Sequence, residues 1–305
     1  MKPWDDFRIF LAAARGGSLS EAGRNLRMDP ATVGRRIARL EQRLGVSLFV
    51  KSQQGYALTE AGLHLLAPVE EAERAMIGAQ DLALGRSSAD HLQGQIRIGA
   101  PDGCANFLLP QVCARIRSDH PDLDIQILSL PRIVNLSRRE ADVAISVSMP
   151  VSGRLTVQKI TDYHLSIAAH VDYLAAHNIR SRADALAHPI VGYIPDMIFD
   201  KELDYLGEIG ADRVALASNS VAVQLQALRH RGGIGIVHDF ALPDAPELRR
   251  LDPELFQLKR SFYLLRHADD RRLPRMNKFS ALLMTYLAEE VHMLENAAEA
   301  QKFVV

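Results

Sequence analysis

The sequence predicts an α+β protein of several domains: an N-terminal winged helix-turn-helix, a long linker helix, and a C-terminal region built from two α/β units. Three observations lead to this prediction. A helix with clear start and stop signals lies near the N-terminus, a narrow apolar seam of helical spacing follows it, and short apolar strands then alternate with helices. We place the domain boundaries at 1–58, 59–89 and 90–305.

Length and composition limit the class of protein. The chain has 305 residues, which is long for one core, and 48% apolar with 24% charged residues is typical of a soluble globular protein. No run approaches the roughly 18 apolar residues of a membrane helix, and Asp5 and Asp6 lie where a signal peptide would be apolar. The two cysteines, Cys104 and Cys113, form no disulfide framework. We therefore expect a cytoplasmic protein without a membrane partner.

Charge is distributed unevenly along the chain. Residues 1–62 carry ten Lys/Arg and six Asp/Glu, whereas the net charge of the whole chain is −1. The N-terminal region is therefore basic and the remainder is acidic. This asymmetry favours nucleic acid as the partner of the N-terminal region.

The best-defined helix is predicted between Asp29 and Gly45. Asp29 is a good N-cap, Pro30 suits the first helical position, and Gly45 suits the left-handed residue that ends a helix. One apolar stripe is formed by Val33, Ile37, Leu40 and Leu44. The opposite face is polar and cationic, so we interpret this segment as a DNA recognition helix.

The elements around this helix fit a winged helix-turn-helix. A first helix is predicted for 4–15, and Ser18 with Glu21 forms the capping-box pattern at the start of a second one. After the recognition helix, a small hairpin with a polar, basic tip is expected at 51–54. Such an arrangement places the last helix in the major groove and the hairpin against the phosphate backbone or minor groove.

A long helix capped by Thr59 is predicted to run towards residue 89. Pro68 should kink this helix. Its apolar seam of coiled-coil spacing consists of Leu65, Val69, Ala72, Met76, Ala79 and Ala83. The helix either packs on its own domain or pairs two subunits, and we favour pairing because the seam is narrow and Glu70, Glu71, Glu73 and Arg74 lie outside it.

From residue 94 the pattern predicts strands at 95–100, 123–130 and 142–147, with a second α/β unit from about residue 165. The loop 99–103 joins the end of a strand to a helix, where backbone N–H groups can bind an anion. Asp102 has an alternative role there as the cap of its own helix.

Several motifs together resemble the LysR-type transcriptional regulators. The N-terminal ones are S-L-S-E-A-G-R-N-L, T-V-G-R-R-I-A-R-L-E-Q-R-L-G-V-S-L-F and L-T-E-A-G. Behind them, in the family's order, come I-R-I-G-A, L-L-P, H-P-D-L-D-I, A-D-V-A-I and G-I-G-I. Pro30 and Gly34 depart from the common glutamine and serine at these positions, on the part of the helix that reads DNA.

The resemblance implies a C-terminal effector domain of two α/β subdomains like those of periplasmic binding proteins, with the effector between them. Subdomain I is expected at about 90–161 and 268–305, and subdomain II at about 162–267. The expected effector-binding residues are Ala100, Pro101, Asp102, Gly103, Ser129, Pro131, Ser146, Ser148, Tyr193, Asn219, Ser220 and Ile234. The expected DNA-binding residues are Ser18, Ala31, Thr32, Arg35, Arg36, Arg39, Lys51 and Gln54.

We therefore expect a sequence-specific regulator that binds double-stranded DNA and is switched by a small-molecule effector. It should be a homo-oligomer, a dimer through 59–89 and a tetramer of such dimers. The alternative is a small-molecule binding protein with weakened or unregulated DNA binding, suggested by Pro30 and Gly34. We expect no enzyme, cofactor or metal, because no catalytic or ligand spacing is present. The two cysteines are expected to be buried structural thiols.

Overall fold

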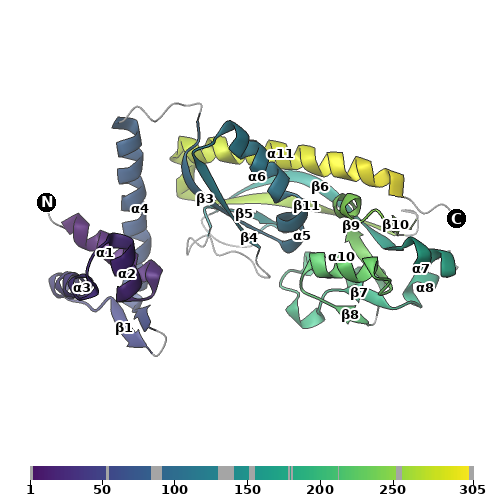
Figure 1. Cartoon of the computed structure of the whole chain (residues 1–305), viewed down its shortest axis with the longest axis horizontal. Helices are drawn as coiled ribbons and strands as arrows, with labels where there is room; N and C mark the ends of the chain where they lie inside the picture. The colour runs from purple at the N-terminus through teal and green to yellow at the C-terminus, as the bar shows by residue number, and fades with distance from the viewer. Residues whose placement is uncertain are drawn as a thin grey trace. The chain divides into compact units, whose positions relative to one another are not determined.

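The computed structural model of the chain comprises two compact units, Met1–Ala89 and Asp90–Val305, which we describe separately (Figure 1). Among the predicted site residues, Gln54 and Pro131 lie outside the described part of the chain. The described residues are 3–52, 55–83, 91–129, 141–150, 155–177, 179, 181–211, 213–251 and 256–301.

The N-terminal unit is a winged helix-turn-helix followed by a long helix, as predicted. Its elements are α1 (Pro3–Gly16), α2 (Leu19–Leu26), α3 (Pro30–Leu44), β1 (Phe49–Ser52), β2 (Gly55–Leu58) and α4 (Glu60–Ala83). The predicted caps are present. Ser18 Oγ accepts a hydrogen bond from the Glu21 N–H at 3.1 Å, Asp29 Oδ1 accepts one from the Ala31 N–H at 2.9 Å, and Gly45 has φ +73°.

Helices α1, α2 and α3 bury their apolar faces against one another. Val33, Ile37 and Leu40 of α3 are buried as predicted, but Leu44 is 40% exposed. Leu44 lies in the last turn of α3, immediately before the left-handed Gly45. The buried stripe of α3 therefore ends one turn earlier than the sequence spacing predicts.

Helix α4 uses the first half of its seam within its own domain. Val69 is buried in the core of the N-terminal unit and Leu65 packs against that core. Arg15 of α1 donates to Glu73 at 2.8 Å and to Glu70 at 3.4 Å, so these two glutamates face α1 and not outwards as we expected. Pro68 lies inside α4 without ending it.

The C-terminal unit is built on one nine-stranded sheet in the order β4-β3-β5-β11-β6-β9-β7-β8, with β10 also paired to β6. β3 pairs in parallel with β4 and β5, and β7 pairs in parallel with β8 and β9. The strands are β3 (Gly94–Ala100), β4 (Leu123–Ser129), β5 (Val143–Ser146), β6 (Leu155–His170), β7 (Ile190–Gly192), β8 (Leu216–Ala217), β9 (Ile234–His238), β10 (Leu248–Arg250) and β11 (Gln257–His267).

The sheet divides the unit into two lobes. Lobe I consists of β3, β4, β5, α5 (Asp102–Phe107) and α6 (Leu109–Asp119). Lobe II consists of β7, β8 and β9 with α7 (Val171–Ala176), α8 (Arg182–Leu186), α9 (Tyr205–Ile209), α10 (Val221–Arg229) and the 3-10 helices η2 (Pro195–Met197), η3 (Lys201–Leu203) and η4 (Asp239–Asp244).

Two long antiparallel strands, β6 and β11, join the lobes. Our sequence boundaries assigned β11 entirely to the second subdomain, but its residues Tyr263–Arg266 pair with β5 of lobe I. The register with β6 shifts between Phe262 and Tyr263. The lobes therefore share these two strands. In this continuous sheet, the buried backbone N–H and C=O groups where the lobes meet are paired between strands.

The closing helix α11 (Pro274–Ala298) lies along this sheet and packs against α6, β6 and η4 (Figure 1). The central core beneath it is aromatic. The ring of Tyr163 stacks on Phe262 with 4.2 Å between centroids and meets Phe240 edge to face. Two further 3-10 helices, η5 (Ala268–Arg272) and η6 (Glu299–Gln301), flank α11.

Candidate functional site

The start of helix α3 presents a small polar surface. Ala31 and Arg35 are exposed and Thr32 is half-buried. The Arg35 guanidinium donates to Thr32 Oγ1 at 3.2 Å, so these side chains form one continuous patch. A methyl-bearing surface beside an arginine can contact a thymine methyl and a guanine edge or a phosphate.

Three arginines on the side of α3 converge on one carboxylate of α1. The side chain of Asp6 is 1% exposed and lies 3.1 Å from Arg36 Nε, 2.8 Å from an Arg39 amino group and 3.3 Å from an Arg43 amino group. A buried carboxylate needs such partners to offset its desolvation. We predicted Arg36 and Arg39 as DNA contacts, and in the structure both side chains also contact Asp6. Asp6 was not among the predicted site residues, because its spacing to α3 is not visible in the sequence.

Gly34 faces α2. A Cβ built on Gly34 would lie 3.3 Å from Leu19 Cδ1. The absence of a side chain at Gly34 therefore permits the close approach of α2 and α3 at this point, on the part of α3 that we expect to read DNA. Pro30 remains at the first turn of α3, next to its N-cap.

The hairpin is anchored to the helical core. The Phe49 ring lies 5.5 Å from that of Phe10 and 5.3 Å from that of Tyr56. Lys51 lies in β1, opposite Tyr56 in the register. Ser18 is the N-cap of α2.

In the C-terminal unit, most of the predicted effector residues follow the C-terminal ends of parallel strands in both lobes. Ligands of open α/β sheets bind at this edge. Ala100 ends β3 and is buried, and Pro101 precedes α5. Gly103 packs against the ring of His238, because a Cβ there would lie 3.2 Å from His238 Cε1. Ile234 is 1% exposed and belongs to the core of the sheet.

Asp102 makes hydrogen bonds with residues of both lobes. One carboxylate oxygen accepts from Asn106 Nδ2 at 2.9 Å and from Ser129 Oγ at 3.1 Å. The other accepts from Ser220 Oγ at 3.1 Å and from the Val221 N–H at 2.6 Å. Asp102 therefore caps α10 of the opposite lobe and not its own helix α5, as we had considered. The N-terminus of α5 therefore has no side-chain capping hydrogen bond.

A second hydrogen bond joins the lobes in the opposite direction. Ser148, after β5 of lobe I, donates from its hydroxyl to the carboxylate of Asp200 in lobe II. Asp200 also accepts from the Glu202 N–H at 3.0 Å and is buried. Ser146 Oγ accepts from the Ser148 N–H at 3.3 Å, while Asn219 is half-buried before α10.

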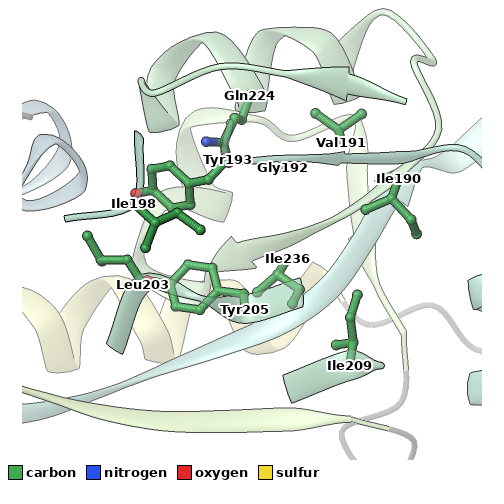
Figure 2. A pocket seen from close by; sticks show the side chains of 10 residues that line it. All are labelled: Ile190, Val191, Gly192, Tyr193, Ile198, Leu203, Tyr205, Ile209, Gln224 and Ile236. Atoms are coloured by element: carbon green, nitrogen blue, oxygen red, sulfur yellow. The ribbon is translucent and has the colours of Figure 1, made fainter. Parts of the chain in front are cut away.

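A small pocket lies in lobe II, and Figure 2 shows its aromatic and aliphatic walls. Its volume is about 20 Å³, which is room for about one water molecule. Tyr193 is the one predicted effector residue that lines it. Burial raises the pKa of both Tyr193 and Tyr205 well above 10, so these phenols are neutral. The lining residues are Ile190, Val191, Gly192, Tyr193, Ile198, Leu203, Tyr205, Ile209, Gln224 and Ile236.

Several titratable groups of the C-terminal unit are held neutral by burial. Burial lowers the pKa of His238 to about 4, although the charge of Asp102 acts in the opposite direction. Burial also raises the pKa of the Cys113 thiol to about 12 and that of Cys104 above its usual range. Both cysteines are free and buried, as predicted for structural thiols.

Within the described residues, no helix has the length and apolar character needed to cross a membrane.

Comparison with known proteins agrees with this architecture. The relative CrgA of Neisseria meningitidis is 25% identical over 190 residues, which cover 62% of this chain and 63% of that protein. The glycine cleavage system transcriptional activator of Escherichia coli is 23% identical over 298 residues, covering 95% of each chain. The solved structure of full-length OxyR from Pseudomonas aeruginosa covers 94% of this chain and 98% of its own, with a TM-score of 0.70 and 15% identity, so this likeness concerns the fold.

Two family models match successive parts of the sequence. The bacterial regulatory helix-turn-helix model of the lysR family matches residues 4–63, which contain the capped α3 and its hairpin. The LysR substrate binding domain matches residues 89–288, which contain both lobes. The match of both domains in this order means that the chain belongs to the LysR family.

Proposed function

We propose that this protein is a transcriptional regulator that reads DNA through α3 and responds to a small molecule held between lobe I and lobe II. The observation that carries the proposal is the exposed start of α3, where Ala31, Thr32 and Arg35 lie together beyond a fixed cap. The rigid cap and the buried stripe hold that end of the helix in one orientation, which a base-reading surface requires.

The α3 side chains have different roles in this proposal. Thr32 and Ala31 contact base edges and so set the sequence preference, whereas Arg35 adds a phosphate contact. Arg36 and Arg39 remain cationic beside the DNA but are oriented by Asp6. The exposed side chain of Arg39 reaches phosphate more readily than that of Arg36, since their exposed fractions are 56% and 28%.

The regulator acts as a homo-oligomer in the cytoplasm. Two subunits pair through the part of α4 that its own domain leaves uncovered, around Met76, which is 46% exposed. Two such dimers form a tetramer. Paired recognition helices then read two half-sites of an imperfect palindrome.

The effector acts by favouring one arrangement of the lobes. Its binding free energy must differ between two arrangements, or it would shift nothing. Polar groups at the strand ends, among them Ser129, Ser146 and Asn219, orient the effector, while the tyrosines provide apolar contact. The homologues named above are transcriptional regulators, which supports regulation over an enzymatic role.

The decisive test is binding of the full-length protein to its own upstream DNA at several salt concentrations. Arg35→Ala should weaken binding to all sequences and reduce the slope of log affinity against log salt by roughly 0.9. Thr32→Ala should instead change the preference between related sequences. Gln42→Ala, on an exposed position of α3 outside the proposed contacts, is the matched control. A wild-type protein without a specific complex would favour the small-molecule binding protein considered above.

A further inference from the structure

Two carboxylates of the C-terminal unit reach from one lobe to the other. Asp102, at the start of α5 in lobe I, accepts hydrogen bonds from Ser220 and Val221 of lobe II. Asp200 of lobe II accepts a hydrogen bond from Ser148 of lobe I. The two lobes are therefore joined by polar contacts whose carboxylates come from each of them.

The Asp102 carboxylate lies at the N-terminus of α10. A helix of this length carries a partial positive charge and unpaired N–H groups at that end, which attract anions. Ser220, the N-cap residue of α10, makes no capping bond of its own, because its hydroxyl donates to Asp102. The Val221 N–H donates to Asp102 at 2.6 Å. An external carboxylate would need these same donors.

The other oxygen of Asp102 is held in lobe I. Asn106 and Ser129 donate to it, so the carboxylate receives four hydrogen bonds from uncharged groups of both lobes. The position that suits an anion is thus filled from within the chain.

We propose that Asp102 is a tethered internal ligand, which occupies the anion position at the start of α10 and holds the lobes together before any effector arrives. This inference rests on the proposed regulatory function and specifies its effector class. An effector that placed a carboxylate at α10 would have to displace Asp102 and would meet its negative charge. The effector is therefore a neutral or cationic organic molecule, which shifts the lobes by competing for the hydrogen bonds of Asp102 and Asp200.

The test is thermal unfolding of the full-length protein in potassium acetate and in potassium chloride at equal ionic strength. Acetate should give the wild type no more protection than chloride does. Asp102→Ala should lower the unfolding midpoint by about 2–4 °C, the effect of losing one helix cap, and acetate should restore it saturably. Asp200→Ala is the matched control: it removes a carboxylate that accepts from a single hydroxyl of the other lobe, so acetate should not restore its midpoint.

Equal, saturable protection of wild type and Asp102→Ala by acetate would overturn the proposal, as would a folded Asp102→Ala that does not respond. If Asp102→Ala does not fold, Asp102→Asn keeps the shape and removes the charge. Amide hydrogens of 221–224 should then exchange several-fold faster than in the wild type, and unchanged exchange would count against the proposal. Neither measurement involves DNA, so failure here is distinct from failure of the DNA-binding proposal.

Discussion

Each unit of this protein contains one aspartate that accepts several hydrogen bonds or ion pairs: Asp6, which is buried, and Asp102, which is half-buried. The two aspartates differ in the kind of group that they contact. Asp6 in the N-terminal unit is 1% exposed and gathers three guanidinium groups from one neighbouring helix. Asp102 in the C-terminal unit is held by uncharged donors from two lobes. A charged cluster favours a fixed orientation of a helix, whereas neutral hydrogen bonds between lobes can be exchanged for those of a ligand.

The largest expected effect concerns the pH dependence of the C-terminal unit. The pKa of His238 is about 4 in the folded protein and about 6.5 when unfolded, so the unfolded state takes up the proton first as the pH falls. The free energy of unfolding should therefore be fully retained above about pH 6.5 and decrease by about 3 kcal/mol towards pH 4. Urea unfolding across this range measures it. His238→Gln should lose much of this slope, and an unchanged slope would contradict the assignment.

The second effect tests whether Asp6 is a fixed support for α3. Asp6→Ala should lower the free energy of unfolding by about 2 kcal/mol, because three guanidinium groups lose their shared acceptor. It should also weaken DNA binding through misoriented arginines, although the domain becomes more positive. The control is Asp5→Ala, whose carboxylate is 64% exposed and 3.9 Å from Arg36. Its stability change should stay within about 0.5 kcal/mol, and equal losses in both variants would remove the distinction.

The smallest effect concerns the neutral donors of Asp102. Ser220→Ala removes one of the two hydrogen bonds that the Asp102 carboxylate receives from lobe II. It should lower the free energy of unfolding, measured by thermal unfolding, by about 1 kcal/mol. Ser218→Ala is a useful comparison, because Ser218 Oγ accepts from the Ser220 N–H at 3.1 Å within lobe II and not across the lobes. A faster exchange of amides at the start of α5 in Ser220→Ala alone would sharpen the contrast between the two aspartates.

Local signals predicted the elements of the fold well. The caps at Ser18, Asp29 and Thr59 act within three residues of themselves, so the sequence contains their partners. Strands such as β3 and β9 are identified by short apolar runs bounded by turns. Helix α4 was the harder case, since one apolar seam suits both a dimer and packing on α1, and the structure assigns Leu65 and Val69 to the second.

The candidate site also combined features that local sequence predicts with contacts between distant segments that it does not predict. Loops at strand ends were predictable because the order of strands and helices sets that edge of the sheet. The role of Asp102 was not, since its acceptor oxygen meets the Val221 N–H 119 positions along the chain. Tyr205 also lines the pocket without any spacing signal.

The sequence by itself therefore determined the order of domains, the caps of helix α3 and the family, which depend on local motifs and on their order along the chain. The tertiary structure decided which side chains are available. It joined Arg36 and Arg39 to Asp6, turned Gly34 towards α2, and placed Asp102 at the start of α10. The physical reason is that caps and periodicity are local, whereas burial and the pairing of charges depend on segments that meet only when the chain folds.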